Sequence, residues 1–105
     1  MENITDLIRQ NLTSGNIRFT LHAFEEMKNE EISPNEVIEV LLTGSLLENY
    51  PNHKRGACCL INGKTKSERQ LHVVCTTANS ITIIITVYEP KLPKFISPTQ
   101  RINSL

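Results

Sequence analysis

The spacing of apolar residues changes at Gly44, and this change constrains the fold more than any other feature of the sequence. Before Gly44, apolar residues recur every three or four positions, as they do on one face of a helix. After Gly44 they tend to alternate with polar residues, which is typical of strands with one buried face. Helices followed by strands indicate an α+β fold, in which we expect three N-terminal helices to pack on one face of an antiparallel sheet of about four strands.

The first two helices are marked by residues that suit helix ends. Apolar residues at helical spacing over residues 4–12 predict an amphipathic helix that ends at Ser14-Gly15. Residues 17–19 are typical of a short extended piece. Thr20 is then placed to cap a second helix, which covers the segment HAFEEMKNEE.

The clearest local signal is the segment ISPNEV. Ser33 is a good capping residue, Pro34 suits the first helical position, and Glu36 stands three residues after the cap. This combination predicts a capping box at the start of the third helix. We expect that helix to end at Gly44, which lets the chain leave through a left-handed conformation.

The strand segments define two faces of the expected sheet. Short turns join four strand-like segments, which predicts an antiparallel meander: residues 46–50, 57–61, 71–77 and 81–88. On the last two segments, alternation places one set of side chains towards the helices: Leu71, Val73, Cys75, Ile81, Ile83, Ile85 and Val87. It places a second set on the face that the helices leave uncovered: His72, Val74, Thr76, Thr82, Ile84, Thr86 and Tyr88.

Length and charge limit the class of protein. The 105 residues suit a single domain, residues 1–105, with a tail at residues 91–105 that is partly flexible or lies along an edge. Lys+Arg and Asp+Glu each total 11, so the chain lacks the overall basic charge of many nucleic-acid-binding proteins. The N-terminus lacks the apolar stretch of a secretory signal, and no segment is as long as a membrane-spanning helix. We therefore expect a cytoplasmic protein with no membrane contact.

The three cysteines predict neither a disulfide nor a metal site. Cys58 and Cys59 are adjacent and Cys75 stands alone, which is neither an even disulfide framework nor the paired spacing of a zinc site. Nothing in the sequence spacing brings the three histidines together with a cysteine. We expect reduced, buried thiols, and we predict no metal and no cofactor.

The polar residues of the uncovered face have two interpretations. His72, Thr86 and Tyr88 are ordinary residues of a solvated strand surface, or they form a ligand site. Val74 and Ile84 are predicted on the same face, and exposed apolar side chains indicate a protein partner or a second copy of the chain.

Five motifs in order give the sequence a family resemblance. HAFEEM, the IS..EV helix start, ENY, LHVV and ITVYEP span roughly residues 17–90, and together they resemble the bacterial family called domain of unknown function 4258. That family is similar to RelE-like and MqsR-like toxins, which have helices followed by a curved antiparallel sheet. The resemblance implies an endoribonuclease of a type II toxin–antitoxin pair, which acts on RNA alone or on the ribosome. Its expected partner is an antitoxin of the zinc-finger or helix-turn-helix type, and a homodimer is the other expected assembly.

The resemblance also implies which residues form the site. Carried over by position, the motif residues are His22, Tyr50, His72, Thr86 and Tyr88. RNA cleavage without a metal needs a base, an acid and a cation, and imidazole suits the first two near neutral pH.

The expected roles differ among the candidate residues. His72 is the preferred proton-transfer residue, Tyr88 contacts a base or phosphate, and Thr86 orients one of them. His22 is the second histidine, and a surface ion pair with nearby glutamates is its other interpretation. We expect three basic residues to bind RNA: Lys54, Arg55 and Arg69.

The sequence departs from the family in its second helix. Where the family commonly has basic residues, this chain has Glu26, Glu30 and Glu31. This loss of positive charge favours the alternative function, a non-catalytic RNA- or protein-binding module that kept the fold.

Overall fold

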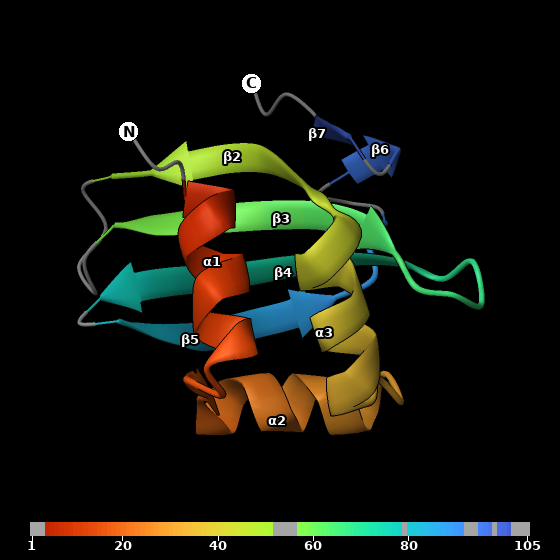
Figure 1. Ribbon diagram of the computed structural model, residues 1–105. Coiled ribbons are helices and arrows are strands. Elements are labelled where there is room, and N and C mark those ends of the chain that lie inside the picture. The colour runs from red at the N-terminus through yellow and green to blue at the C-terminus, as the bar shows by residue number, and fades with distance from the viewer. Residues whose placement is uncertain (1–3, 52–56, 79, 92–94, 98, 102–105) are drawn as a thin grey trace.

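A five-stranded mixed sheet forms the centre of the protein (Figure 1). The structure is a computed structural model that describes residues 4–51, 57–78, 80–91, 95–97 and 99–101. The helices are Ile4–Thr13 (α1), Leu21–Asn29 (α2) and Pro34–Thr43 (α3). The strands are Ile17–Phe19 (β1), Ser45–Tyr50 (β2), Cys58–Lys64 (β3), Gln70–Ala78 (β4), Ile81–Tyr88 (β5), Phe95–Ser97 (β6) and Gln100–Arg101 (β7).

The strand order is β1-β5-β4-β3-β2, and β2 to β5 form the expected antiparallel meander. The prediction of about four strands in a wholly antiparallel sheet was wrong at one edge. There, β1 adds a fifth strand parallel to β5. Backbone hydrogen bonds extend this pairing at both ends, with Thr82 N to Asn16 O at 3.0 Å and Thr20 N to Ile84 O at 3.0 Å. Three residues are too few to show a strand periodicity, so the sequence gives no sign of this pairing.

The expectation that all three helices cover one face of the sheet was wrong. Figure 1 shows α1 and α3 across one face, whereas α2 lies along the edge next to β5. From this edge α2 still buries Ala23 and Met27 in the core. The buried core residues come from the helices, the α2–α3 connection and the sheet: Ile8, Ala23, Met27, Ile32, Val37, Val40, Leu41, Cys59, Ile61, Leu71, Val73, Cys75, Ile84 and Val87.

The predicted helix ends are largely confirmed. The Thr20 hydroxyl accepts a hydrogen bond from Ala23 N at 3.1 Å and caps α2. Ser33 and Glu36 form the capping box of α3, with Glu36 N to Ser33 Oγ at 3.2 Å and Ser33 N to Glu36 Oε1 at 2.9 Å. After α1, Gly15 has the left-handed φ of +74°.

Gly44 ends α3 for a reason other than the one predicted. Its φ of −76° and ψ of 177° are extended, not left-handed. A Cβ at this position would lie 2.5 Å from Val40 O and 2.7 Å from Asn62 O. Glycine is therefore required because α3 and β3 approach too closely for any side chain.

A β-bulge in β5 changes which side chains face the helices. The pairing shifts between Val74–Thr86 and Cys75–Ile84, so that Ile85 has no pairing partner on β4. The predicted faces are correct after the bulge, where Val87 is buried in the core. Before the bulge the prediction was wrong, because Ile84 and Thr82 are 0% exposed, whereas Ile83 and Ile85 are only half-buried. Asn11 Nδ2 donates a hydrogen bond to the buried Thr82 hydroxyl at 3.0 Å, so the buried oxygen of Thr82 has a hydrogen-bond partner.

The C-terminal region adds a small separate sheet. The strands β6 and β7 pair with each other in an antiparallel arrangement within the predicted tail. Among the described residues, no helix combines the length and the apolar character needed to cross a membrane.

Candidate functional site

The register of β4 and β5 pairs His72 with Tyr88. Both alternate with residues of the core that the helices share, Leu71, Val73 and Val87, so they face the other side of the sheet. His72 Nδ1 lies 3.3 Å from the Tyr88 hydroxyl oxygen, and the two rings meet edge to face with centroids 5.3 Å apart. Thr86 stands opposite Val74, two residues before Tyr88 on the same face. The structure thus brings together three of the residues predicted for the site.

The strand β2 brings a second polar pair to this face. The Tyr50 hydroxyl donates to the Glu48 carboxylate. Glu48 stands opposite Leu60 on β3, which in turn stands opposite Val74 on β4. Glu48 is not among the predicted site residues, although alternation places it on the same side of the strand as Tyr50. We call these side chains the polar face: Glu48, Tyr50, His72, Thr86 and Tyr88.

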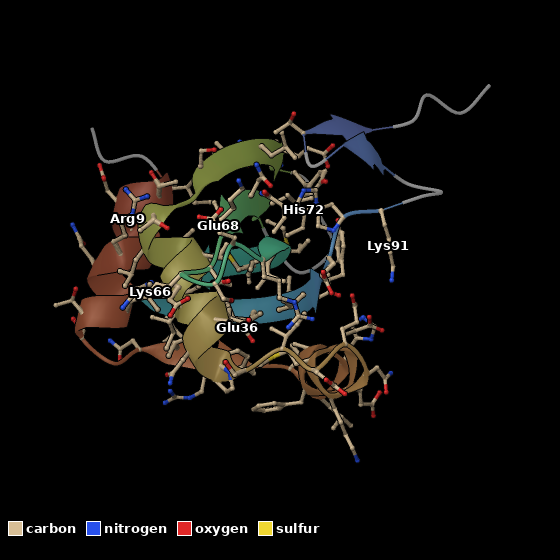
Figure 2. The ribbon with its side chains drawn as sticks, turned by 90° about the vertical axis from the view of Figure 1, so that its right-hand side faces the viewer. Arg9, Glu36, Lys66, Glu68, His72 and Lys91 are labelled. Atoms are coloured by element: carbon tan, nitrogen blue, oxygen red, sulfur yellow. The ribbon has the colours of Figure 1, made fainter. Side chains whose placement is uncertain are left out.

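The polar face is more enclosed than we expected. His72 is 0% exposed and the neighbouring Leu60 is 1% exposed, although neither belongs to the core cluster beneath the helices. Figure 2 shows Lys91 and the β6–β7 hairpin on the side of the sheet away from α1 and α3. The expectation that His72 is open to a ligand was therefore wrong for this conformation.

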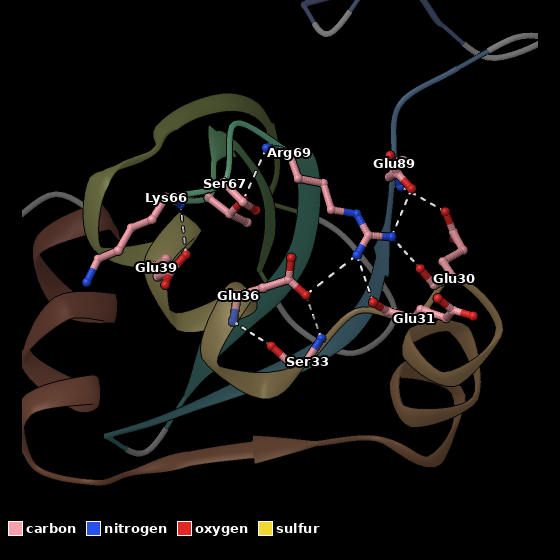
Figure 3. A network of polar contacts seen from close by, with 10 residues as sticks. Glu30, Glu31, Ser33, Glu36, Glu39, Lys66, Ser67, Arg69 and Glu89 are labelled. Carbon is pink, nitrogen blue, oxygen red and sulfur yellow. Dashed lines mark hydrogen bonds and ion pairs between the residues drawn. The ribbon is translucent and has the colours of Figure 1, made fainter.

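Arg69, predicted to bind RNA, contacts protein oxygens instead (Figure 3). One terminal nitrogen donates to Glu89 Oε1 at 2.9 Å and to the carbonyl of Glu30. The other donates to the carbonyl of Glu31 at 2.7 Å and lies 3.5 Å from Glu36 Oε1. The hydrogen bond with Glu89 is the main reason why the pKa of Arg69 is raised above its ordinary value. These contacts occupy the part of the guanidinium group that would bind phosphate.

The structure does not bring His22 to His72. His22 is exposed in the first turn of α2, and the chain just before it contacts Ile84 at Thr20. His72 lies opposite Tyr88, at the far end of β5. The other basic candidates, Lys54 and Arg55, and the loop residue His53 lie outside the described residues. In the part of the chain that the structure describes, no three His, Cys, Asp or Glu side chains gather as metal ligands do.

The three cysteines are free and buried, as predicted. Cys59 and Cys75 stand opposite each other on β3 and β4, with their sulfur atoms 3.8 Å apart. The pKa of Cys75 is raised well above its ordinary value, mainly because of its hydrogen bond with Cys59 and also because of burial. A raised pKa keeps this thiol protonated and unreactive.

The sequence was also compared with known proteins. Residues 19–89 match the family described as "Domain of unknown function (DUF4258)". Because the match covers most of the chain, the protein belongs to this family, as its motifs suggested. No curated protein and no solved structure matches the chain.

Proposed function

We propose that this protein is a toxin-like endoribonuclease that cleaves RNA without a metal ion and is paired with an antitoxin in the cytoplasm. The observation that supports this proposal is the contact between His72 and Tyr88, with Thr86, Tyr50 and Glu48 on the same face. Histidine, tyrosine and carboxylate side chains are the groups that proteins use to transfer protons.

The proposed reaction is attack by the RNA 2′-hydroxyl on the adjacent phosphorus. His72 Nε2 accepts the proton of the 2′-hydroxyl, while Nδ1 faces Tyr88. The new O–P bond forms as the bond to the 5′-oxygen breaks, and the departing oxygen takes a proton from water. Tyr88 contacts a base or the phosphate, and Thr86 orients one of these groups. The products are a 2′,3′-cyclic phosphate and a 5′-hydroxyl.

The proposal includes a condition on access. Because His72 is 0% exposed, RNA reaches its imidazole only after the groups that cover it move. In this proposal Lys54 and Arg55 supply the positive charge that binds the RNA phosphate, since Arg69 is engaged by protein oxygens. Binding of RNA or of the ribosome must therefore favour the conformation in which His72 is uncovered.

The test of this function is cleavage of RNA by the purified protein in EDTA, with and without ribosomes. We expect fragments that end in a 2′,3′-cyclic phosphate, and we expect induced expression to slow growth. Co-expression with the product of the neighbouring gene should restore growth and give a complex on size-exclusion chromatography. Intact RNA under both conditions, together with normal growth, would refute the nuclease proposal.

A second candidate is a non-catalytic RNA- or protein-binding module. It is favoured by the complete burial of His72 and by the engagement of Arg69. This module would bind the same antitoxin-like partner, RNA or a second copy of the chain without cutting RNA. A stable complex without cleavage or growth inhibition supports this function over the first.

A further inference from the structure

We propose that Arg69 is a positioning residue that holds Tyr88 against His72. The proposal extends the proposed function, on which its catalytic consequence rests. From its sequence, Arg69 is predicted to bind RNA. The structure instead places its guanidinium group where four segments of the chain meet: the start of β4, the end of β5, the end of α2 and the start of α3 (Figure 3).

The backbone of Arg69 is fixed by the turn that joins β3 to β4. Arg69 O accepts a hydrogen bond from Thr65 N at 2.8 Å, and Arg69 N donates to the Thr65 hydroxyl at 3.1 Å. Glu68 completes this turn with a φ of +69°. The Arg69 side chain therefore extends from a backbone that two hydrogen bonds hold in place, three residues before His72.

The end of β5 needs support from outside the sheet. The described pairing of β4 with β5 ends at His72–Tyr88, and Pro90 has no backbone N–H to continue it. Glu89, directly after Tyr88, is held by two contacts instead. Its backbone N donates to Glu30 Oε1 at 3.1 Å, and its carboxylate accepts from Arg69 at 2.9 Å.

Arg69 connects both of these contacts. It binds the Glu89 carboxylate directly. It also binds the backbone carbonyls of Glu30 and Glu31, and this holds Glu30, whose carboxylate accepts the hydrogen bond from Glu89 N. Glu36, part of the capping box of α3, lies 3.5 Å from the same guanidinium group. Loss of Arg69 therefore releases the end of β5 next to the 3.3 Å contact between Tyr88 and His72.

A planar guanidinium group is required for this role. Each terminal nitrogen faces two oxygens from different segments, and the ammonium group of lysine cannot reproduce this fork. Arg69→Lys should therefore resemble Arg69→Met. If Arg69 bound RNA phosphates instead, the lysine variant would keep most of the affinity because it keeps the charge.

The experiment compares Arg69→Met and Arg69→Lys by NMR of the histidine rings. Tyr88→Phe defines the ring ¹⁵N shifts of His72 without the hydroxyl contact. We expect both Arg69 variants to move these shifts towards the Tyr88→Phe values, while the exposed His22 ring stays unchanged. Lys66→Met is the matched control, because it removes an exposed cation from the same hairpin. Glu89→Gln, a milder change, keeps the test valid if Arg69→Met does not fold, and it should shift His72 in the same direction.

The RNA-cleavage readout separates positioning from binding. A positioning role predicts that kcat falls roughly tenfold with KM nearly unchanged, because the reacting groups are misaligned. A rise in KM with kcat unchanged, and a weaker dependence on salt, would assign Arg69 to RNA and overturn the proposal. Folded Arg69 variants with wild-type His72 shifts, or equal shifts in Lys66→Met, would also overturn it. The NMR result stands even if the wild-type protein leaves RNA intact, so failure of the proposed function is distinguished from failure of this inference.

Discussion

The bulge at Ile85 makes a sharp prediction about two neighbouring residues of the same type. Ile84 is 0% exposed within the core, whereas Ile85 is half-buried and has no partner on β4. Truncation to alanine removes the same three carbon atoms at each position. At Ile84 the lost burial is about 2.4 kcal/mol, at about 0.8 kcal/mol per carbon. The enclosed cavity adds to this, giving a total of about 3–4 kcal/mol.

At Ile85 we expect a loss of only about 1 kcal/mol, because the side chain is already partly in contact with water and leaves no closed cavity. In a domain of this size, Ile84→Ala should lower Tm by roughly 15 °C and Ile85→Ala by about 5 °C. Thermal and urea unfolding of the two variants measure these differences directly. A loss at Ile85 equal to or larger than the loss at Ile84 would refute the bulge and restore the simple alternation.

Three further predictions concern other parts of the fold. Gly44→Ala should lower the free energy of unfolding by about 2 kcal/mol or more, because the new Cβ meets two backbone oxygens; urea unfolding tests it, and a neutral variant would contradict the close approach. Ser33→Ala should cost about 1 kcal/mol through loss of the capping box, also measured by urea unfolding. The hydrogen bond between the two thiols raises the pKa of Cys75 and lowers the pKa of Cys59, so as pH rises above about 8.5 the contribution of Cys75 to stability should fall while that of Cys59 opposes it. Cys75→Ala should show a weaker decline in stability over the same pH range.

Local sequence signals predicted the elements that depend on few neighbouring residues. The capping box of Ser33 and Glu36 is complete within four positions, and its geometry is present as predicted. The change of period at Gly44 separated α3 from the strands correctly. The capping box works as a signal because its hydrogen bonds form within one segment, and the change of period works because burial of one face leaves a repeat within each helix or strand.

Features that depend on distant contacts could not be predicted. The strand β1 is defined by pairing with residues more than sixty positions later in the sequence. The bulge at Ile85 arises because β5 has one more residue than β4 between two neighbouring pairs. Strict alternation therefore failed at Ile84. The role of Arg69 was also missed, because its partners at Glu30, Glu31 and Glu89 lie in three different segments of the sequence.

The candidate site was partly predictable for the same reasons. His72 and Tyr88 lie on the expected face because the β4–β5 pairing is regular from His72–Tyr88 to Val74–Thr86, and the bulge comes only beyond this stretch. The burial of His72 depends on how the rest of the chain covers that face, which periodicity does not describe.

The most direct test of the account is the rate of RNA cleavage in EDTA by the wild-type protein, His72→Ala and His22→Ala. The account predicts cleavage by the wild type and a loss on the order of a hundredfold or more in His72→Ala, the usual contribution of a general acid or base. The exposed His22 serves as the matched control, and His22→Ala should retain most of the activity. Cleavage that survives His72→Ala, or that is lost equally in both variants, would contradict the assignment of His72 as the proton-transfer residue.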